Sequence, residues 1–323
     1  MTRAGWTLVA LVVTFAAIGP WLTPHAPSQR FEDRAYAPPM PVRIIDDGGH
    51  WRAPFVYAVR LENRLERRYA EDRRQPIPLT WFTAGKLVGL SDESAGPWLP
   101  LGGDSYGRDV FARLAYGSRL SLAVALAAAF GALVIGTLVG GLAGLRRGLI
   151  DDGLMRLADF VLVLPAMYVV LALRAALPLV LPVTAVFVLV AGILAVVGWP
   201  LVARGVRAIV ASEGERDYAQ AARALGVGPW RLLRRHLLPA ARGFLVTQVT
   251  LLVPAFILAE ATLSYVGLGF PDPSTSWGTM LQEAANVAAI SDAPWTLSPA
   301  IAIFLVVLGV NLIVRRPGVG VRR

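Results

Sequence analysis

The chain has 323 residues, of which 55% are hydrophobic and 16% charged, and its mean hydropathy is +0.56. This composition is too apolar for a soluble domain of that length, so we expect a membrane protein. The absence of cysteine excludes disulfides and thiolate chemistry, and three scattered histidines lack the spacing of a metal site. The formal charge of +9 does not call for nucleic acid, since a membrane protein needs arginines at its cytoplasmic edges.

Six apolar segments have the length of about 20 residues that a helix needs to cross a bilayer. The predicted spans are 4–23, 120–145, 154–177, 183–203, 244–267 and 296–314. The fold class that follows is an all-α polytopic membrane protein with six transmembrane helices. The first segment also fits a secretory signal peptide, but no small-residue cleavage site is evident and five further spans follow, which favours an uncleaved span.

Among the short connections, those expected inside carry the arginines, whereas the short turns 178–182 and 268–295 contain no Lys or Arg; the long segment 24–117 does not count, since long loops translocate regardless of charge. This positive-inside pattern predicts a multi-pass protein of the cell inner membrane with a cytoplasmic N-terminus. The expected organisation has five parts: a first transmembrane helix at 1–23, an extracytoplasmic insert at 24–117, a five-helix core at 118–316, a basic loop at 207–243 within that core, and a basic cytoplasmic tail at 317–323.

The insert at 24–117 is nearly neutral, with 13 Lys and Arg against 12 Asp and Glu. Short aromatic and β-branched runs at 51–61 and 78–90 predict strands, so the insert is expected to have mixed structure. Two interpretations remain open. The insert contacts a substrate-delivery protein, or it caps the outer mouth of the membrane domain.

A polar and strongly basic stretch at 213–239 separates two apolar segments. Four of its apolar residues have the helical spacing i, i+3, i+4 and i+7, namely Tyr218, Ala221, Ala222 and Leu225. Gly226 is placed to end this helix in the left-handed conformation, and Pro229 suits the first turn of a second helix. That second helix would have an apolar stripe and a basic stripe, formed by Trp230, Leu233 and Leu237 and by Arg231, Arg234 and Arg235. Periodicity alone is equally compatible with an interfacial amphipathic helix.

The stretch resembles the coupling loop of ABC importer permeases, the "EAA" motif, at Ala221, Ala222, Gly226, Leu238 and Pro239. Gln220 departs from the motif, which has Glu there. The resemblance implies that the loop docks into a groove of a separate ATPase subunit. The residues expected to serve this coupling are Asp217, Tyr218, Ala221, Ala222, Leu225, Gly226 and Pro239.

Two further motifs resemble the "C"-type permeases of the dipeptide, oligopeptide and nickel importer family. One is Leu-Gly-Gly-Asp-Ser-Tyr-Gly-Arg-Asp at 101–109, and the other runs from 254 through the Ser-Trp-Gly-Thr-Met-Leu segment at 276–281. The family's acidic C-terminal tail is replaced here by a basic one. In the first motif we expect tight backbone and local ion pairing outside the membrane, from Gly102, Asp104, Gly107, Arg108 and Asp109.

Polar residues inside spans are candidates for a translocation pathway, because charge in hydrocarbon is costly. Glu260 is the first candidate, with a purely structural buried hydrogen bond as the alternative. Ser264, Tyr265 and Asn311 are further candidates. Asp159 is instead expected to pair with Arg156, one turn away.

No reaction chemistry is visible. The single lysine, Lys86, lies outside any Gly-x-x-x-x-Gly-Lys pattern, so ATP and Mg would bind to partner ATPase subunits and not to this chain. The resemblance implies a non-enzymatic permease subunit that moves di- or oligopeptides or a related solute by alternating access. Its implied partners are a second permease subunit, two ATPase subunits and an extracytoplasmic solute-binding protein, within membrane lipid and without nucleic acid. The alternatives are an ion-driven secondary transporter and a membrane-anchored extracytoplasmic sensory or structural protein.

Overall fold

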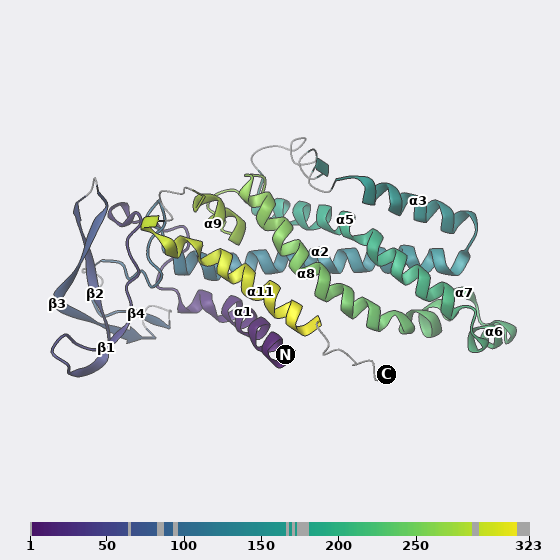
Figure 1. Cartoon of the computed structure of the whole chain (residues 1–323), viewed down its shortest axis with the longest axis horizontal. Helices are drawn as coiled ribbons and strands as arrows, with labels where there is room; N and C mark the ends of the chain where they lie inside the picture. Colours follow the sequence, from purple (N-terminus) through teal and green to yellow (C-terminus); the bar gives the residue numbers. More distant parts are fainter. Residues whose placement is uncertain are drawn as a thin grey trace, which may run out of the picture. The chain divides into compact units, whose positions relative to one another are not determined.

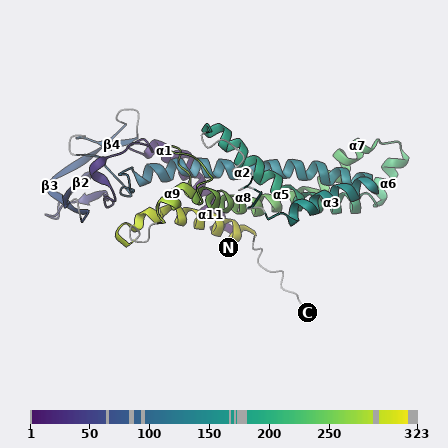
Figure 2. The same ribbon diagram turned by 90° about the horizontal axis from the view of Figure 1, so that it is seen from above.

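A computed structural model describes residues 2–63, 66–82, 87–92, 96–165, 168–169, 172, 181–285 and 291–314 (Figures 1 and 2). The chain divides into two compact units, one formed by Met1–Ser121 with Ala261–Ile313 and the other by Leu122–Glu260 with Val314–Arg323. The helices are α1 (Thr2–Leu22), α2 (Val110–Arg146), α3 (Leu149–Val163), α5 (Val183–Glu213), α6 (Asp217–Ala224), α7 (Pro229–Leu232), α8 (Arg242–Tyr265), α9 (Trp277–Glu283) and α11 (Ser298–Val314). The strands are β1 (Arg43–Ile45), β2 (Trp51–Asn63), β3 (Arg68–Trp81) and β4 (Val88–Leu90).

Five helical segments of the described chain are long and apolar enough to cross a membrane: Arg3–Leu22, Val110–Arg146, Val183–Glu213, Pro229–Tyr265 and Pro294–Val314. They match five of the six predicted spans. The remaining one, 154–177, begins within α3, but most of its second half lies outside the described residues. The six-helix count therefore stays a prediction.

Two of these helices extend beyond the predicted spans. The helix α2 begins at Val110, ten residues before the predicted start, and α5 continues to Glu213, ten residues beyond the predicted end. The sequence placed these segments outside the apolar spans because they carry arginines. In the structure, Arg113, Arg119 and Arg207 each bind a carboxylate or a backbone carbonyl, which offsets the cost of placing them in long helices.

The insert contains a four-stranded antiparallel sheet in the order β1-β2-β3-β4 (Figure 1). Phe55 of β2 lies opposite Pro78 of β3, and Thr80 of β3 lies opposite Gly89 of β4. The predicted strand at 51–61 is confirmed as part of β2. The short runs predicted at 78–90 are also strands in part, since the stretch contains the end of β3 and the whole of β4.

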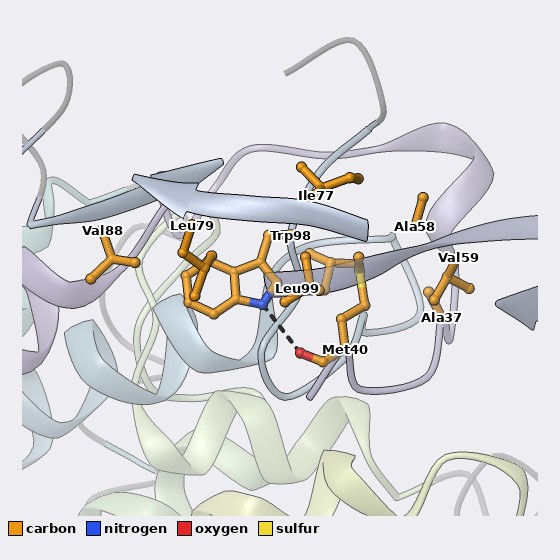
Figure 3. Close-up of a cluster of buried hydrophobic side chains, with 10 residues drawn as sticks. Ala37, Met40, Ala58, Val59, Ile77, Leu79, Val88, Trp98 and Leu99 are labelled. Atoms are coloured by element: carbon orange, nitrogen blue, oxygen red, sulfur yellow. Dashed lines mark hydrogen bonds between the residues drawn. The ribbon is translucent and has the colours of Figure 1, made fainter. Parts of the chain in front are cut away.

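One face of this sheet packs on the segments that lead into and out of it (Figure 3). Val56, Ile77 and Leu79 of the strands lie against Trp98 and Leu99, which precede α2. The Trp98 indole Nε1 donates a 3.2 Å hydrogen bond to the Met40 carbonyl. Buried indoles need such a partner, so this bond fixes the ring within the core.

In the same unit, α1 packs on α11 and on the first turns of α2. A β-carbon on Gly5 of α1 would lie 2.6 Å from the Gly309 carbonyl oxygen of α11, so only glycine permits this approach. The rings of Phe15 and Phe111 meet edge to face at 5.7 Å. Arg119 of α2 donates from Nε to the Ala16 carbonyl at 2.7 Å.

In the other unit, α2 packs on α5 through three glycines spaced four residues apart. A β-carbon on Gly136 would lie 2.5 Å from the Val202 β-carbon, and one on Gly144 would lie 2.7 Å from the Arg207 carbonyl oxygen. Gly140, between them, faces the Ala203 carbonyl. Small residues at this spacing let membrane helices approach closely, so the α2–α5 contact is built for close packing of two spans.

The helix α3 packs along α5 and is joined to it by two ion pairs. Arg207 of α5 holds the Asp151 carboxylate through Nε at 2.9 Å and through Nη2 at 2.5 Å. Asp159 pairs with Arg204 of α5, so the expectation that it pairs with Arg156 is wrong. The sequence favoured Arg156, one turn away on the same helix, whereas packing of α3 on α5 brings Arg204 from farther along the chain.

Candidate functional site

The basic loop between α5 and α8 forms the helix-turn-helix that its pattern predicts. The helix α6 spans Asp217–Ala224 and ends at Gly226, whose φ is +78°. The Gly226 amide donates to the Arg223 carbonyl at 2.9 Å, and the Val227 amide donates to the Ala222 carbonyl at 3.0 Å. These two bonds are those of a Schellman cap. The prediction that Gly226 ends the helix in the left-handed conformation is confirmed.

The helix α6 has one face that is buried against the chain and another that is exposed. Ala219 and Ala222 are buried, whereas Ala221 is exposed and Tyr218 is 41% exposed. Leu225, at the end of the helix, is 84% exposed. Of the four residues of the predicted apolar face, only Ala222 is covered by the chain itself, because α6 lies on the chain through Ala219 and Ala222. Its large apolar side chains remain on the surface.

The second part of the loop begins at Pro229, as predicted. The helix α7 leads into a π-helical turn (Leu233–Leu237) and a 3₁₀ turn (Leu238–Ala241), with half-buried Pro239 in the latter. Leu233 and Leu237 are buried, but Trp230 is 59% exposed, so only two of the three predicted stripe residues face inward. The basic stripe lies on the surface at Arg231, Arg234 and Arg235.

Polar contacts hold the loop to the ends of the neighbouring helices. Arg147, which follows α2, donates to the Ala211 carbonyl at 2.9 Å and pairs with Glu215 at 2.8 Å. The Tyr218 hydroxyl donates to Glu213 at 2.7 Å. Partial desolvation and this carboxylate raise the pKa of the Tyr218 hydroxyl. The exposed Leu225, Trp230 and Tyr218 thus lie on a loop whose base is fixed, which suits a docking surface.

In the other unit, the motif at 101–109 forms part of a buried ion network. Asp104 accepts from Arg108 Nε at 2.7 Å and also binds Arg113. Arg108 further donates to Asp272 at 3.0 Å and to Glu283 at 2.6 Å, while Arg113 Nη2 donates to Glu283 at 2.9 Å. Both guanidinium groups are almost fully buried. The network therefore joins the start of α2 to α9 and to the segment before it.

Glycines allow the backbone of this motif to fold tightly, as predicted. Gly102 and Gly107 have φ values of +78° and +71°. A β-carbon on Gly102 would lie 2.6 Å from the Ala37 carbonyl oxygen, and one on Gly107 would clash with the Phe31 carbonyl.

Asp109 is buried but does not join the network, so the expected pairing of all three motif charges is only partly correct. One oxygen of Asp109 accepts from the Phe111 amide at 2.9 Å, and the other lies 3.4 Å from His25 Nδ1. Burial raises the pKa of the Asp109 carboxyl, and the hydrogen bond with His25 partly opposes this shift.

Sequence reasoning identified Asp104 and Arg108 but missed Arg113, Asp272 and Glu283. Two of these lie more than 160 residues from their partners along the chain. The signal that was present is the charge of Arg113, just before a span, together with that of Glu283, shortly before the last span.

The expected pathway residues fall into two groups. Glu260 and Ser264 of α8 are both buried, at 1% exposure. The Ser264 hydroxyl lies 3.3 Å from that of Ser276, which caps α9 by accepting from the Thr279 amide. Tyr265 is half exposed, and Asn311 is exposed and donates to the Val307 carbonyl of its own helix. Of the four, only Glu260 and Ser264 present polar groups to the protein interior.

Comparison with known proteins gives a consistent result. The model of the family described as "binding-protein-dependent transport system inner membrane component" matches residues 118–316. The oligopeptide transport system permease protein OppC of Bacillus subtilis is 37% identical over 66% of this chain and 67% of its own length. The di/tripeptide transport system permease protein DppC of Pseudomonas aeruginosa is 32% identical over 95% of this chain and 83% of its own length, so it also aligns with the insert.

A putative peptide permease protein of Brucella ovis is 38% identical over 69% of this chain and 73% of its own length. Among solved structures, a chain of the MetNI methionine ABC transporter in an inward-facing conformation has a TM-score of 0.47 and 21% identity, covering 62% of this chain and 94% of its own. On the family model and the relatives above 30% identity, this chain belongs to the family of binding-protein-dependent transport system inner membrane components.

Proposed function

We propose that the chain is the membrane-spanning subunit of an ATP-driven importer of di- or oligopeptides, with its N-terminus in the cytoplasm. The relatives named as peptide permeases support the substrate class. The arginines of the loop at 207–243 support the orientation, because short cytoplasmic connections are enriched in arginine. In this arrangement the insert and the network around Arg108 face the outside.

The single observation that carries the coupling role is the surface of the basic loop. Leu225, Trp230 and Tyr218 are exposed beside arginines, on a loop that a Schellman cap and an Arg147–Glu215 pair hold in place. A rigid, short helix that presents large apolar side chains fits a hydrophobic groove on a partner. We assign that groove to an ATPase subunit, which binds ATP and Mg in place of this chain.

The complete importer in this proposal contains a second permease subunit, two ATPase subunits and an extracytoplasmic binding protein. The permease pair moves peptide by alternating access as ATP is bound and hydrolysed. Glu260 is the residue proposed to face the pathway or its gate, because a carboxylate buried in a span is costly unless it serves a polar cavity or a partner.

Leu225→Asp tests the docking surface, since this side chain is almost free of contacts within the chain. We expect ATPase subunits to be lost on co-purification while the permease still inserts and keeps its thermal stability. Gln220→Glu is the comparison variant, because it adds the same charge to an exposed position of the same loop and restores the family's motif residue, although it removes the 2.9 Å hydrogen bond from Gln220 Nε2 to the Glu215 carbonyl. If Leu225→Asp retains the ATPase subunits as well as Gln220→Glu does, this surface is not the docking site.

A further inference from the structure

The helix α1 has an exposed tryptophan near each end, at Trp6 and Trp21. Tryptophan is enriched where a transmembrane helix passes through the membrane–water interface. The Trp21 ring also lies under the Arg119 guanidinium, 5.6 Å from its centroid. Since arginine side chains near span ends reach toward the headgroup layer, Trp21 marks the level at which α1 leaves the bilayer.

The corner between β3 and β4 is hydrogen bonded to this end of α1. The Leu87 amide donates to the Trp21 carbonyl at 3.2 Å, and the Phe82 amide donates to the Leu87 carbonyl at 3.0 Å. Leu87 therefore links Phe82 to the end of α1 through two backbone hydrogen bonds. Both bonds lie within one compact unit of the chain.

The two aromatic side chains at this corner face outward. Phe82 is 80% exposed and Trp81 is 58% exposed, so neither contributes much to the core of the sheet. Phe82 also has a φ of +59°, in the left-handed region that bulky residues rarely adopt. Glycine or asparagine would occupy this position with less strain. A strained phenylalanine without a core role indicates that its side chain serves an external partner.

We propose that Trp81 and Phe82 insert into the interfacial layer of the membrane leaflet that surrounds the end of α1, and so anchor the insert to lipid. This corner lies beside the residue that marks the end of the span, because the Leu87 amide is bonded to the Trp21 carbonyl. Tryptophan and phenylalanine are the side chains that favour the headgroup–acyl boundary. The partner is therefore the lipid surface itself, not a particular headgroup.

Trp51 provides a matched position on the same sheet. It is 76% exposed, like Phe82, but begins β2 in the hairpin with β1. Among the described residues, neither strand of this hairpin is hydrogen bonded to α1. If exposure of an aromatic side chain were sufficient for lipid contact, positions 51 and 82 would both contact lipid. The proposed anchor predicts lipid contact at position 82 alone.

The absence of native cysteine allows a direct test with single nitroxide labels at Phe82→Cys and Trp51→Cys, in the full chain reconstituted into lipid nanodiscs. Accessibility to dissolved oxygen, which concentrates in lipid, is compared with accessibility to a water-soluble nickel chelate. We expect the ratio of oxygen to nickel accessibility to be several-fold higher at position 82 than at position 51. Equal ratios at the two positions would overturn the proposal. Protection of position 82 from both reagents would also overturn it, because that result indicates a covering protein surface.

A second measurement separates anchoring from folding. The label is moved to Trp81→Cys, and Phe82 is changed to glycine or to leucine in that background. Glycine suits the left-handed backbone, so folding is retained, but the oxygen-to-nickel ratio at position 81 should fall. Leucine restores an apolar side chain and should restore the ratio. Unchanged ratios in both variants would show that Phe82 does not anchor the corner.

Discussion

Replacing Gly226 with valine is expected to weaken the attachment of the ATPase subunits. The φ of +78° at this position places a β-branched residue in the left-handed region, which costs about 1–2 kcal/mol. No heavy atom lies within 4 Å of the position that a β-carbon would take, so the cost comes from backbone conformation and not from a clash. If the backbone of the variant instead leaves the left-handed region, it loses the Schellman bonds donated by Gly226 and Val227, each worth about 0.5–1.5 kcal/mol.

The sequence offers a matched control two residues away. Gly228 has a φ of −61° and a ψ of 150°, which any residue adopts, and a β-carbon there also meets nothing within 4 Å. Gly228→Val therefore adds the same side chain to the same exposed turn without backbone strain.

The assay is the apparent affinity of purified permease for the ATPase subunits, with ATP-dependent uptake as a second readout. A strain of about 1–2 kcal/mol that docking must overcome corresponds to about a 5- to 30-fold weaker affinity for Gly226→Val. Gly228→Val should weaken the affinity less than Gly226→Val does, because Gly228 is the N-cap of α7 without a side-chain cap bond, and valine there loses only the N-cap preference of glycine. Equal affinities for the two variants would refute the view that the left-handed cap positions the docking surface.

The remaining predictions concern three carboxylates. Glu283→Gln should lower the free energy of unfolding. The loss should be smaller than that of a fully buried pair, about 3–5 kcal/mol, since Glu283 is 25% exposed, but larger than that of Glu215→Gln, whose exposed pair is worth at most about 1 kcal/mol. Equal thermal shifts for the two variants would contradict this. Glu260→Gln should preserve assembly but alter uptake per ATP hydrolysed in reconstituted vesicles, and Glu260→Leu should be worse; parental coupling in both would remove Glu260 from the pathway. Because burial raises the pKa of the Asp109 carboxyl above its ordinary value, its protonated form stabilises the fold at low pH, and this stability is lost as the pH rises through the folded-state pKa. Asp109→Asn should therefore gain stability over the parent as the pH is raised from 4 to neutral, and parallel stability–pH curves would contradict the assignment.

Local features of the chain were predictable because they depend on neighbours in sequence. Hydropathy located five spans that the structure describes, and the position of Gly226 after a short helical pattern predicted its conformation. The strand at 51–61 was predicted from its short run of aromatic and β-branched residues. The close α2–α5 contact also has a readable signal in the sequence, namely three glycines spaced four residues apart from Gly136.

Other features depend on contacts between distant segments. The early start of α2 was missed because the uncharged segment begins only after Arg119. In the structure, Arg119 binds the Ala16 carbonyl and Arg113 pairs with Glu283, 170 residues away. The predicted partner of Asp159, Arg156, was wrong for the same reason, since Arg204 becomes a neighbour of Asp159 only when α3 packs on α5. The burial of Ala222 was also not predictable, because periodicity gives the residues that share one side of a helix but not which of them the chain itself covers.

The central claim is that this chain imports peptides using ATP hydrolysed by subunits docked on its basic loop. The most direct measurement is peptide uptake into vesicles that contain the permease pair and ATPase subunits, with binding protein supplied on the side opposite the loop. The account predicts uptake that requires ATP on the side of the loop and is lost with Leu225→Asp. Uptake that proceeds without ATP under an ion gradient, or that persists with Leu225→Asp, would contradict it.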